Sequence, residues 1–286
     1  MVTINNLFKN KNIQCLQTLG AFGIYEHVSD LSNDSKDAQK KFFMHLMNVR
    51  KRQLLCDLTK SSVRVQAGAM QWTTGKVLSE TGLGSGASAI GGFLKGAVKG
   101  LVTGESAVKP LYEGNGFVML EPTERHILLE DVSKWGPGGI VVEDGMFLAC
   151  ESSVEEKVVM QKNLSAALGG GEGLFNLSMK GKGIAALESH VPREELIEFV
   201  LEDDEVKIDG DMAIAWPGSL EFTVERSSKS LVGSLVNGEG LVNVYRGSGR
   251  VLMAPTIPGT EMDQDNSPEK PNAVKSILGA VGKLAT

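Results

Sequence analysis

The glycine-rich run 82–92 is the first stretch of the sequence whose residue types could support chemistry. Backbone amides of such loops bind phosphate groups. A Walker loop needs GxxxxGK followed by Ser or Thr. Gly86 and Gly91 have that spacing, but Gly92 stands where the lysine belongs. A dinucleotide fingerprint is also disfavoured, because no βαβ pattern surrounds the run. We therefore predict no nucleotide site here.

Histidine and serine patterns do not indicate a reaction either. The four histidines are His27, His45, His126 and His190. No two of them have the spacing of a metal-ligand pair such as HxH or HExxH. A metal enzyme on a β-helix-like scaffold needs a histidine cluster on neighbouring strands, so this class is disfavoured. No GxSxG elbow occurs, and Ser106 has no evident base. We predict no enzyme, no cofactor, no metal site and no catalytic residue.

Three glutamates recur in equivalent surroundings. They belong to a Gly-Glu element whose glycines are spaced by 67 residues: Gly104-Glu105, Gly171-Glu172 and Gly238-Glu239. One interpretation is turn geometry, in which each carboxylate accepts bonds from nearby amides. The other is a ring of acids around a pseudo-three-fold axis, which could bind a cation. We favour the turn and keep the glutamates as weak binding candidates.

A second glycine element follows apolar runs. Its members are Gly68, Gly145 and Gly210, the last two preceded by aspartate. Asp-Gly between apolar runs is a strong hairpin signal, because both turn positions tolerate a positive φ. A Gly-x-Gly pair also follows each Gly-Glu element: Gly114-Asn115-Gly116, Gly181-Lys182-Gly183 and Gly247-Ser248-Gly249. Signatures recurring in one order indicate an internal repeat.

The elements that position these residues are therefore three β units, covering 53–122, 126–189 and 195–255. We predict an all-β fold with small peripheral helices and a pseudo-three-fold axis. Residues 1–52 form an extension with a strand near Ile13–Leu16. Its helix is expected to begin at Asn33 or Asp34 and to carry Ala38, Phe42, Leu46 and Val49 on one face. Residues 256–286 are predicted to be a polar linker and a short amphipathic helix, 273–286.

Composition limits the function classes. The 286 residues have a net charge of −6 and a pI of about 5.4, so the basic footprint of a nucleic-acid-binding protein is absent. Three distant cysteines do not form a disulfide framework. The first residues contain no apolar stretch of signal-peptide length. A cytoplasmic location is the resulting expectation.

Three segments resemble the altered-inheritance-of-mitochondria family, also called a mitochondrial biogenesis family. They are VRVQAGAMQWTTGKV, LKGAVKGLVTGES and GEGLVNVYRGSGRVLMAP, and the resemblance covers about 53–255. The patterns Gly68-Ala69-Met70 and 103–106 are the most specific. The resemblance implies a three-repeat fold similar to the tryptophan RNA-binding attenuation protein. Mitochondrial members are implicated in organising the inner membrane, and no catalytic residues are established for the family. The first fifty residues depart from its pattern.

The sequence thus favours a non-enzymatic scaffold or assembly protein. We expect a homo-oligomer that binds a protein or membrane-surface partner, for which 273–286 is the candidate segment. The alternative is a small-ligand or nucleic-acid binding module on the same fold. It rests on fold-level analogy alone, and the acidic charge makes a nucleic acid an unlikely partner.

Overall fold

The structure is a computed structural model that describes residues 2–80, 109–160, 175–209, 212–226 and 241–256. Residues Met1–Pro255 form one compact unit, and Thr256–Thr286 form a second. The expected linker and the expected helix at 273–286 lie outside the described residues, apart from Thr256.

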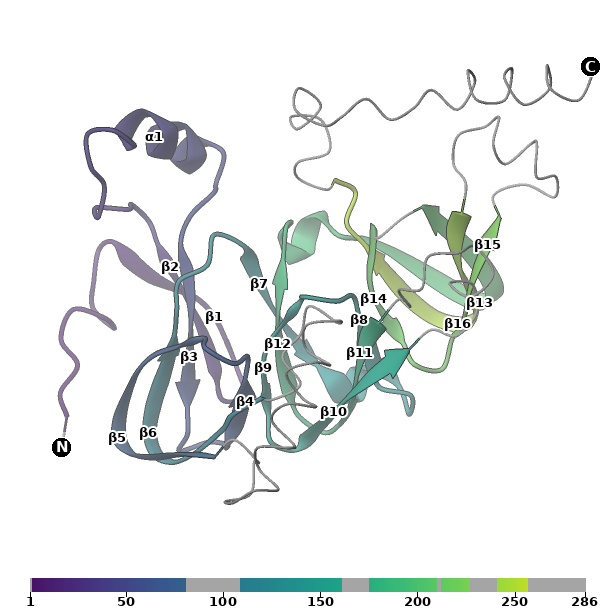
Figure 1. Ribbon diagram of the computed structural model, residues 1–286, viewed down its shortest axis with the longest axis horizontal. Helices are drawn as coiled ribbons and strands as arrows, with labels where there is room; N and C mark the ends of the chain where they lie inside the picture. The colour runs from purple at the N-terminus through teal and green to yellow at the C-terminus, as the bar shows by residue number, and fades with distance from the viewer. Residues whose placement is uncertain (1, 81–108, 161–174, 210–211, 227–240, 257–286) are drawn as a thin grey trace, which may run out of the picture. The chain divides into compact units, whose positions relative to one another are not determined.

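Two sheets make up the described part of the first unit (Figure 1). The first contains β1 (Ile13–Leu19), β2 (Phe22–His27), β3 (Arg52–Asp57), β4 (Val63–Val65), β5 (Met70–Glu80), β6 (Leu111–Leu120), β7 (His126–Asp131), β9 (Phe147–Glu151) and β12 (Ile184–Ser189). The second contains β8 (Ile140–Val142), β10 (Val154–Met160), β11 (Phe175–Gly181), β13 (Ile197–Asp209), β14 (Ala213–Pro217), β15 (Glu221–Arg226) and β16 (Leu241–Met253). The described helices are α1 (Ala38–Leu46) and the short 3₁₀ helices η1 (Val132–Trp135) and η2 (Arg193–Glu195). The mainly β fold predicted from the sequence is confirmed.

The first sheet curls back on itself. Its strand order is β1-β2-β3-β6-β4-β9-β12-β7, with β5 paired to the other edge of β6. Ile24 of β2 and Ile127 and Leu129 of β7 nevertheless belong to one buried cluster. Side chains near opposite ends of the strand order therefore share a core, as in a barrel. No hydrogen-bonded pairing between β1 and β7 closes the sheet within the described residues.

The Gly-x-Gly pairs mark sharp bends in long strands. The first glycine of each pair has a positive φ: +125° at Gly114, +125° at Gly181 and +119° at Gly247. A Cβ on Gly114 would collide with the Lys76 carbonyl oxygen on the neighbouring strand. After Gly181 the chain leaves β11 in the second sheet and enters β12 in the first. At Gly114 and Gly181 glycine is required because backbone of another strand or loop approaches closely, whereas at Gly247 the positive φ alone favours it.

The hairpin interpretation of the Asp-Gly element is wrong. Gly68 and Gly145 do lie in turns, with φ of +80° and +75°. The strands flanking Gly145, however, pair elsewhere: β8 with β11 and β14, and β9 with β12 and β4. The strands flanking Gly68 likewise do not pair with each other, since β5 pairs with β6. A tight turn tolerating positive φ also suits a chain that passes between sheets, which the dipeptide alone does not distinguish.

The helix of the N-terminal extension begins later than expected. Its N-cap is Asp37 rather than Asn33 or Asp34, and α1 covers Ala38–Leu46. The side chain of Asp34 accepts hydrogen bonds from the backbone N–H groups of Lys36 and Asp37, at 2.9 and 3.0 Å. Asp34 therefore stabilises a turn before the helix instead of the helix itself. No helix among the described residues is long and apolar enough to cross a membrane.

Candidate docking loop

The most unusual described surface belongs to the loop between β2 and β3, residues 28–51, here called the α1 loop. Its ends are fixed because β2 and β3 are adjacent antiparallel strands. Its middle is α1, which has no buried residue. A nine-residue helix without burial is marginal in water, so it needs a surface for stabilisation.

The helix presents its apolar side chains to solvent. Phe42, Phe43, Leu46 and Met47 are 60%, 55%, 63% and 77% exposed, and are here called the docking face. The rings of Phe42 and Phe43 contact each other edge to face, with centroids 5.7 Å apart. Leu31 of the same loop is also exposed. Contiguous apolar surface of this kind is typical of an interaction site.

The polar side of α1 is directed to the loop's own acid, Asp30. Lys41 of α1 and Lys51 each place Nζ 3.1 Å from the Asp30 carboxylate. Ser32 also donates hydrogen bonds to this carboxylate through its backbone N–H and its hydroxyl. These hydrogen bonds, the Ser32 hydroxyl first and then the two lysines, hold the pKa of Asp30 well below its usual range. Lys41 is thus held at Asp30, while the side chains of the docking face stay exposed.

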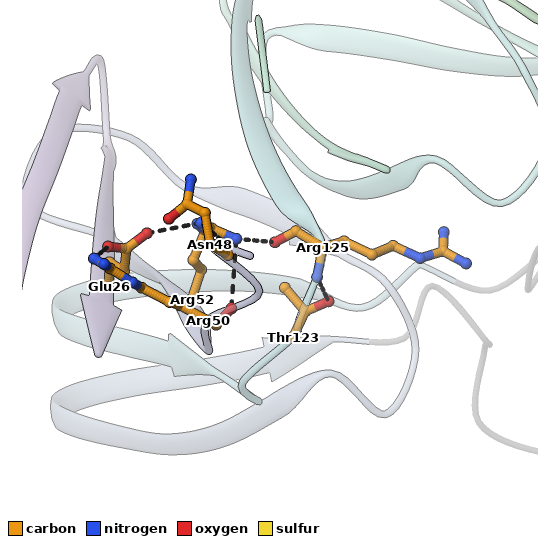
Figure 2. A network of polar contacts seen from close by, with 6 residues as sticks. All are labelled: Glu26, Asn48, Arg50, Arg52, Thr123 and Arg125. Atoms are coloured by element: carbon orange, nitrogen blue, oxygen red, sulfur yellow. Dashed lines mark hydrogen bonds and ion pairs between the residues drawn. The ribbon is translucent and has the colours of Figure 1, made fainter. Parts of the chain in front are cut away.

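A buried ion-pair network fixes the base of the loop (Figure 2). Arg52 places Nη2 2.8 Å from Glu26 Oε2, and Arg50 places Nη1 2.8 Å from Glu26 Oε1. Arg52 also donates to the carbonyl oxygens of Asn48 and Arg125, at 3.3 and 3.5 Å. Both members of the Glu26–Arg52 pair are buried. The network therefore holds the returning end of the loop on the β body.

Two cavities border this base. One, of about 240 Å³, lies beneath α1 and is lined in part by His27, Phe42 and His45. The other, of about 520 Å³, is lined by residues of β1, β2, β7 and η2 and is here called the seam cleft. It contains Glu26, Arg52 and His126. Desolvation, and then the charge of Arg52, lower the pKa of His126.

Two carboxylates of the seam cleft, Glu130 and Glu26, have partners within the protein. Glu130 accepts hydrogen bonds from Trp135 Nε1 at 3.2 Å and from Arg193 Nε at 3.1 Å. Glu26 is held by its two arginines. The described residues contain no group of three or more His, Cys, Asp or Glu that could bind a metal. The cleft can accept a polar ligand, but its geometry does not indicate a reaction.

The sequence-predicted binding residues cannot be placed relative to this site, because the structure does not describe them. Glu105, Glu172 and Glu239, with Gly104, Gly171, Gly238 and Gly210, lie outside the described residues. The sequence reasoning did not find the Glu26–Arg52 pair. A signal was available, because a charged residue opens the apolar run Arg52-Gln53-Leu54-Leu55-Cys56. Charged residues in buried strands are normally paired.

The architecture defines a mainly β protein with curled sheets and a protruding helical loop. Similarity to a solved structure agrees with this class. An X-ray crystal structure of a Streptococcus pyogenes protein matches with a TM-score of 0.51 and 23% identity, over 83% of this chain and 95% of that chain.

Sequence comparison is more specific. The family described as Mitochondrial biogenesis AIM24 matches residues 45–256, and the chain belongs to this family. An uncharacterised protein of Streptococcus pyogenes serotype M6 is 28% identical over 195 residues, which cover 67% of this chain and 76% of that protein. The matched region begins at residue 45, so most of the α1 loop precedes it.

Proposed function

We propose that this protein is a non-enzymatic scaffold that self-associates and docks on a partner surface through the α1 loop. The observation that supports docking is the exposed docking face. Those four side chains lie on a loop whose base is held by a buried ion-pair network. A loop with a fixed base and exposed apolar side chains at its tip is suited to docking on another surface.

A three-repeat body is the second part of the proposal. It is supported by a strand-pairing scheme that recurs in the three units. In this scheme the long last strand of a unit pairs with earlier strands of that unit on both of its edges. In the first unit, β6 pairs with β3 and β4 on one edge and with β5 on the other. In the last unit, β16 pairs with β13 and with β14 and β15. In the middle unit, β11 and β12 divide this role, pairing with β8 and β10 and with β7 and β9.

The positive φ at Gly114, Gly181 and Gly247 adds support for the repeat. The pseudo-three-fold axis and the likeness to the tryptophan RNA-binding attenuation protein remain part of this proposal. So do a cytoplasmic location and a second partner contact through 273–286.

Sedimentation of the protein from native cell extract tests the docking role. The variant Phe42→Ser/Leu46→Ser removes half of the docking face, and we expect it to move from a fast-sedimenting assembly to a slower one. The matched control is Leu78→Ser/Val200→Ser, which removes two side chains of similar exposure, 63% and 70%, from β5 and β13. Identical sedimentation of the docking-face variant and the wild type would refute the docking role.

A small-ligand binding module is the alternative function, and the seam cleft favours it. Its volume of about 520 Å³ lies within the usual range of ligand sites. The mixed charges of Glu26, Arg52 and Arg193 suit a small polar molecule. A thermal-shift screen of small polar metabolites tests this function. A metabolite that raises the melting temperature of the wild type, but not of a seam-cleft variant such as Arg193→Ala, would support it.

A further inference from the structure

We propose that the partner surface of the α1 loop is an anionic lipid bilayer, on which α1 lies with its apolar side inward to the lipid. This inference rests on the docking role proposed above and names its partner. The argument depends on the side-chain types of the docking face, on the charge around it and on its area.

The side chains of the docking face are those that enter a lipid interface. Two phenylalanines, a leucine and a methionine are more than half exposed, while Lys41 is held by its ion pair with Asp30. Interfacial helices bury such a face at the boundary between headgroups and acyl chains. A soluble protein normally turns the apolar side of a helix toward its own core. In α1 no residue is buried, and the side chains of the docking face are left exposed.

Charge around the docking face is complementary to anionic headgroups. The α1 loop contains five basic residues, Lys36, Lys40, Lys41, Arg50 and Lys51, and three acidic ones, Asp30, Asp34 and Asp37. The loop therefore has a net charge of +2, whereas the rest of the chain holds 24 of the 29 Lys and Arg and 32 of the 35 Asp and Glu. Lys41, Arg50 and Lys51 form ion pairs inward, whereas Lys36 and Lys40 are exposed beside the helix. Exposed lysines next to an apolar face can reach lipid phosphates while their stems cover the apolar surface.

The size of the docking face argues against a second copy as its occupant. Stable protein–protein interfaces bury about 800 Å² on each partner, from roughly 20–30 residues. The docking face has four large side chains, three on a helix of nine residues and one, Met47, at its C-cap. A lipid surface needs no complementary partner face of that size, because each buried apolar side chain adds directly to the partition free energy.

Vesicle co-sedimentation with the full chain tests the proposal. One set of vesicles is phosphatidylcholine, and the other is an equal mixture of phosphatidylcholine and phosphatidylglycerol. We expect binding to the anionic vesicles that weakens at high salt. The variant Phe42→Ser/Phe43→Ser/Leu46→Ser/Met47→Ser should bind at least about tenfold more weakly. Since α1 has no buried residue, its circular dichroism and melting temperature should remain close to wild type.

Two control pairs separate the contributions. Lys36→Gln/Lys40→Gln should weaken anionic binding several-fold, whereas Lys180→Gln/Lys182→Gln, which removes two exposed lysines elsewhere, should not. Leu78→Ser/Val200→Ser should bind like the wild type. Equal binding to neutral and anionic vesicles, or binding that survives loss of the docking face, would overturn the lipid assignment.

Failure of this inference can be told apart from failure of the docking role. If vesicles are not bound but the docking-face variant still changes sedimentation in cell extract, the partner is a protein and the lipid assignment is wrong. If neither measurement responds to the docking face, both proposals are wrong.

Discussion

Arg52 and Glu26 lie directly opposite each other on β3 and β2, and their side chains form an ion pair of 2.8 Å. The two side chains are 3% and 7% exposed. The pair sits where the α1 loop leaves and rejoins the sheet. A buried charge needs its partner far more than an exposed one, because the unpaired charge keeps its desolvation cost. This pair therefore couples folding of the body to the position of the loop.

Replacing Arg52 by Met should destabilise the protein by about 3 kcal/mol, because it leaves Glu26 buried with Arg50 as its remaining partner. Urea denaturation measures the change. The double variant Glu26→Gln/Arg52→Met should recover part of the loss, since no buried charge is then left unpaired. Arg193→Met is the control, because Arg193 is 40% exposed and such pairs contribute about 0–1 kcal/mol. If Arg52→Met lowers the free energy of unfolding no more than Arg193→Met does, the buried pair contributes no more to stability than an exposed pair.

Alanine substitutions at Gly114 and Gly68 should destabilise the protein by different amounts. Gly114→Ala should destabilise by about 3 kcal/mol or more, because a Cβ collides with the Lys76 carbonyl oxygen and φ is +125°. Gly68→Ala should cost only about 1–2 kcal/mol, since φ is +80° but no atom lies within 4 Å of the added Cβ. Valine at Gly68 or Gly145 should cost about 1–3 kcal/mol. Equal melting temperatures for the two alanine variants would contradict the close approach of strands.

The glycines show which parts of the fold can be predicted from the sequence and which cannot. The regular Gly-x-Gly spacing was visible because a backbone requirement selects one residue type, and positive φ is found at the first glycine of every pair. The partners of each strand were not visible. The Asp144-Gly145 turn looked like a hairpin because turn chemistry is local, whereas the pairing of β8 with β11 and β14 depends on distant residues.

The α1 loop shows the same limit for the candidate site. The spacing of Ala38, Phe42, Leu46 and Val49 predicts a helix with an apolar face. A helix is present there, but it ends at Leu46 and does not include Val49. Periodicity does not state which way that face points. Its direction follows from Asp30, which binds Lys41 and Lys51 and was not linked to them by any sequence pattern. Contacts of this kind depend on the fold, so the docking face could be recognised only in the structure.

Thiol reactivity should distinguish the three cysteines. Cys15 is exposed, whereas Cys56 and Cys150 are buried, and burial raises the pKa of both buried thiols. The thiolate is the reactive form, so a native sample at pH 8 should titrate one thiol per chain with Ellman's reagent. Unfolding should expose all three. Cys15→Ser should abolish the native reaction, and a native count above one would show that the core around Cys56 or Cys150 opens.

Acid should break the ion pairs that Asp30 forms with Lys41 and Lys51 in the α1 loop. Because the folded-state pKa of Asp30 is lowered, its stabilising contribution is complete above the unfolded-state pKa of about 3.9 and is lost as the pH falls below it. The protection of the α1 amides, measured as their exchange rate relative to that of the unfolded chain at the same pH, should fall over that window while the strands stay protected. Asp30→Asn should exchange rapidly already at pH 6. An unchanged exchange rate in this variant would mean that Lys41 and Lys51 do not fix the helix.

Self-association is the last prediction, and the edge strands indicate where to test it. Among the described edge strands, β5, β7, β10, β13 and β15 all carry charged residues, whereas Ile13–Leu19 of β1 carries none. Exposed edges without charge are prone to pair with another chain. Light scattering should therefore give a mass above 30.6 kDa at micromolar concentration. Leu16→Lys places a charge on β1 and should lower that mass, while Val200→Lys on the already charged β13 should not. A wild type that stays at 30.6 kDa would refute self-association, and an oligomer that tolerates Leu16→Lys would place its interface away from β1.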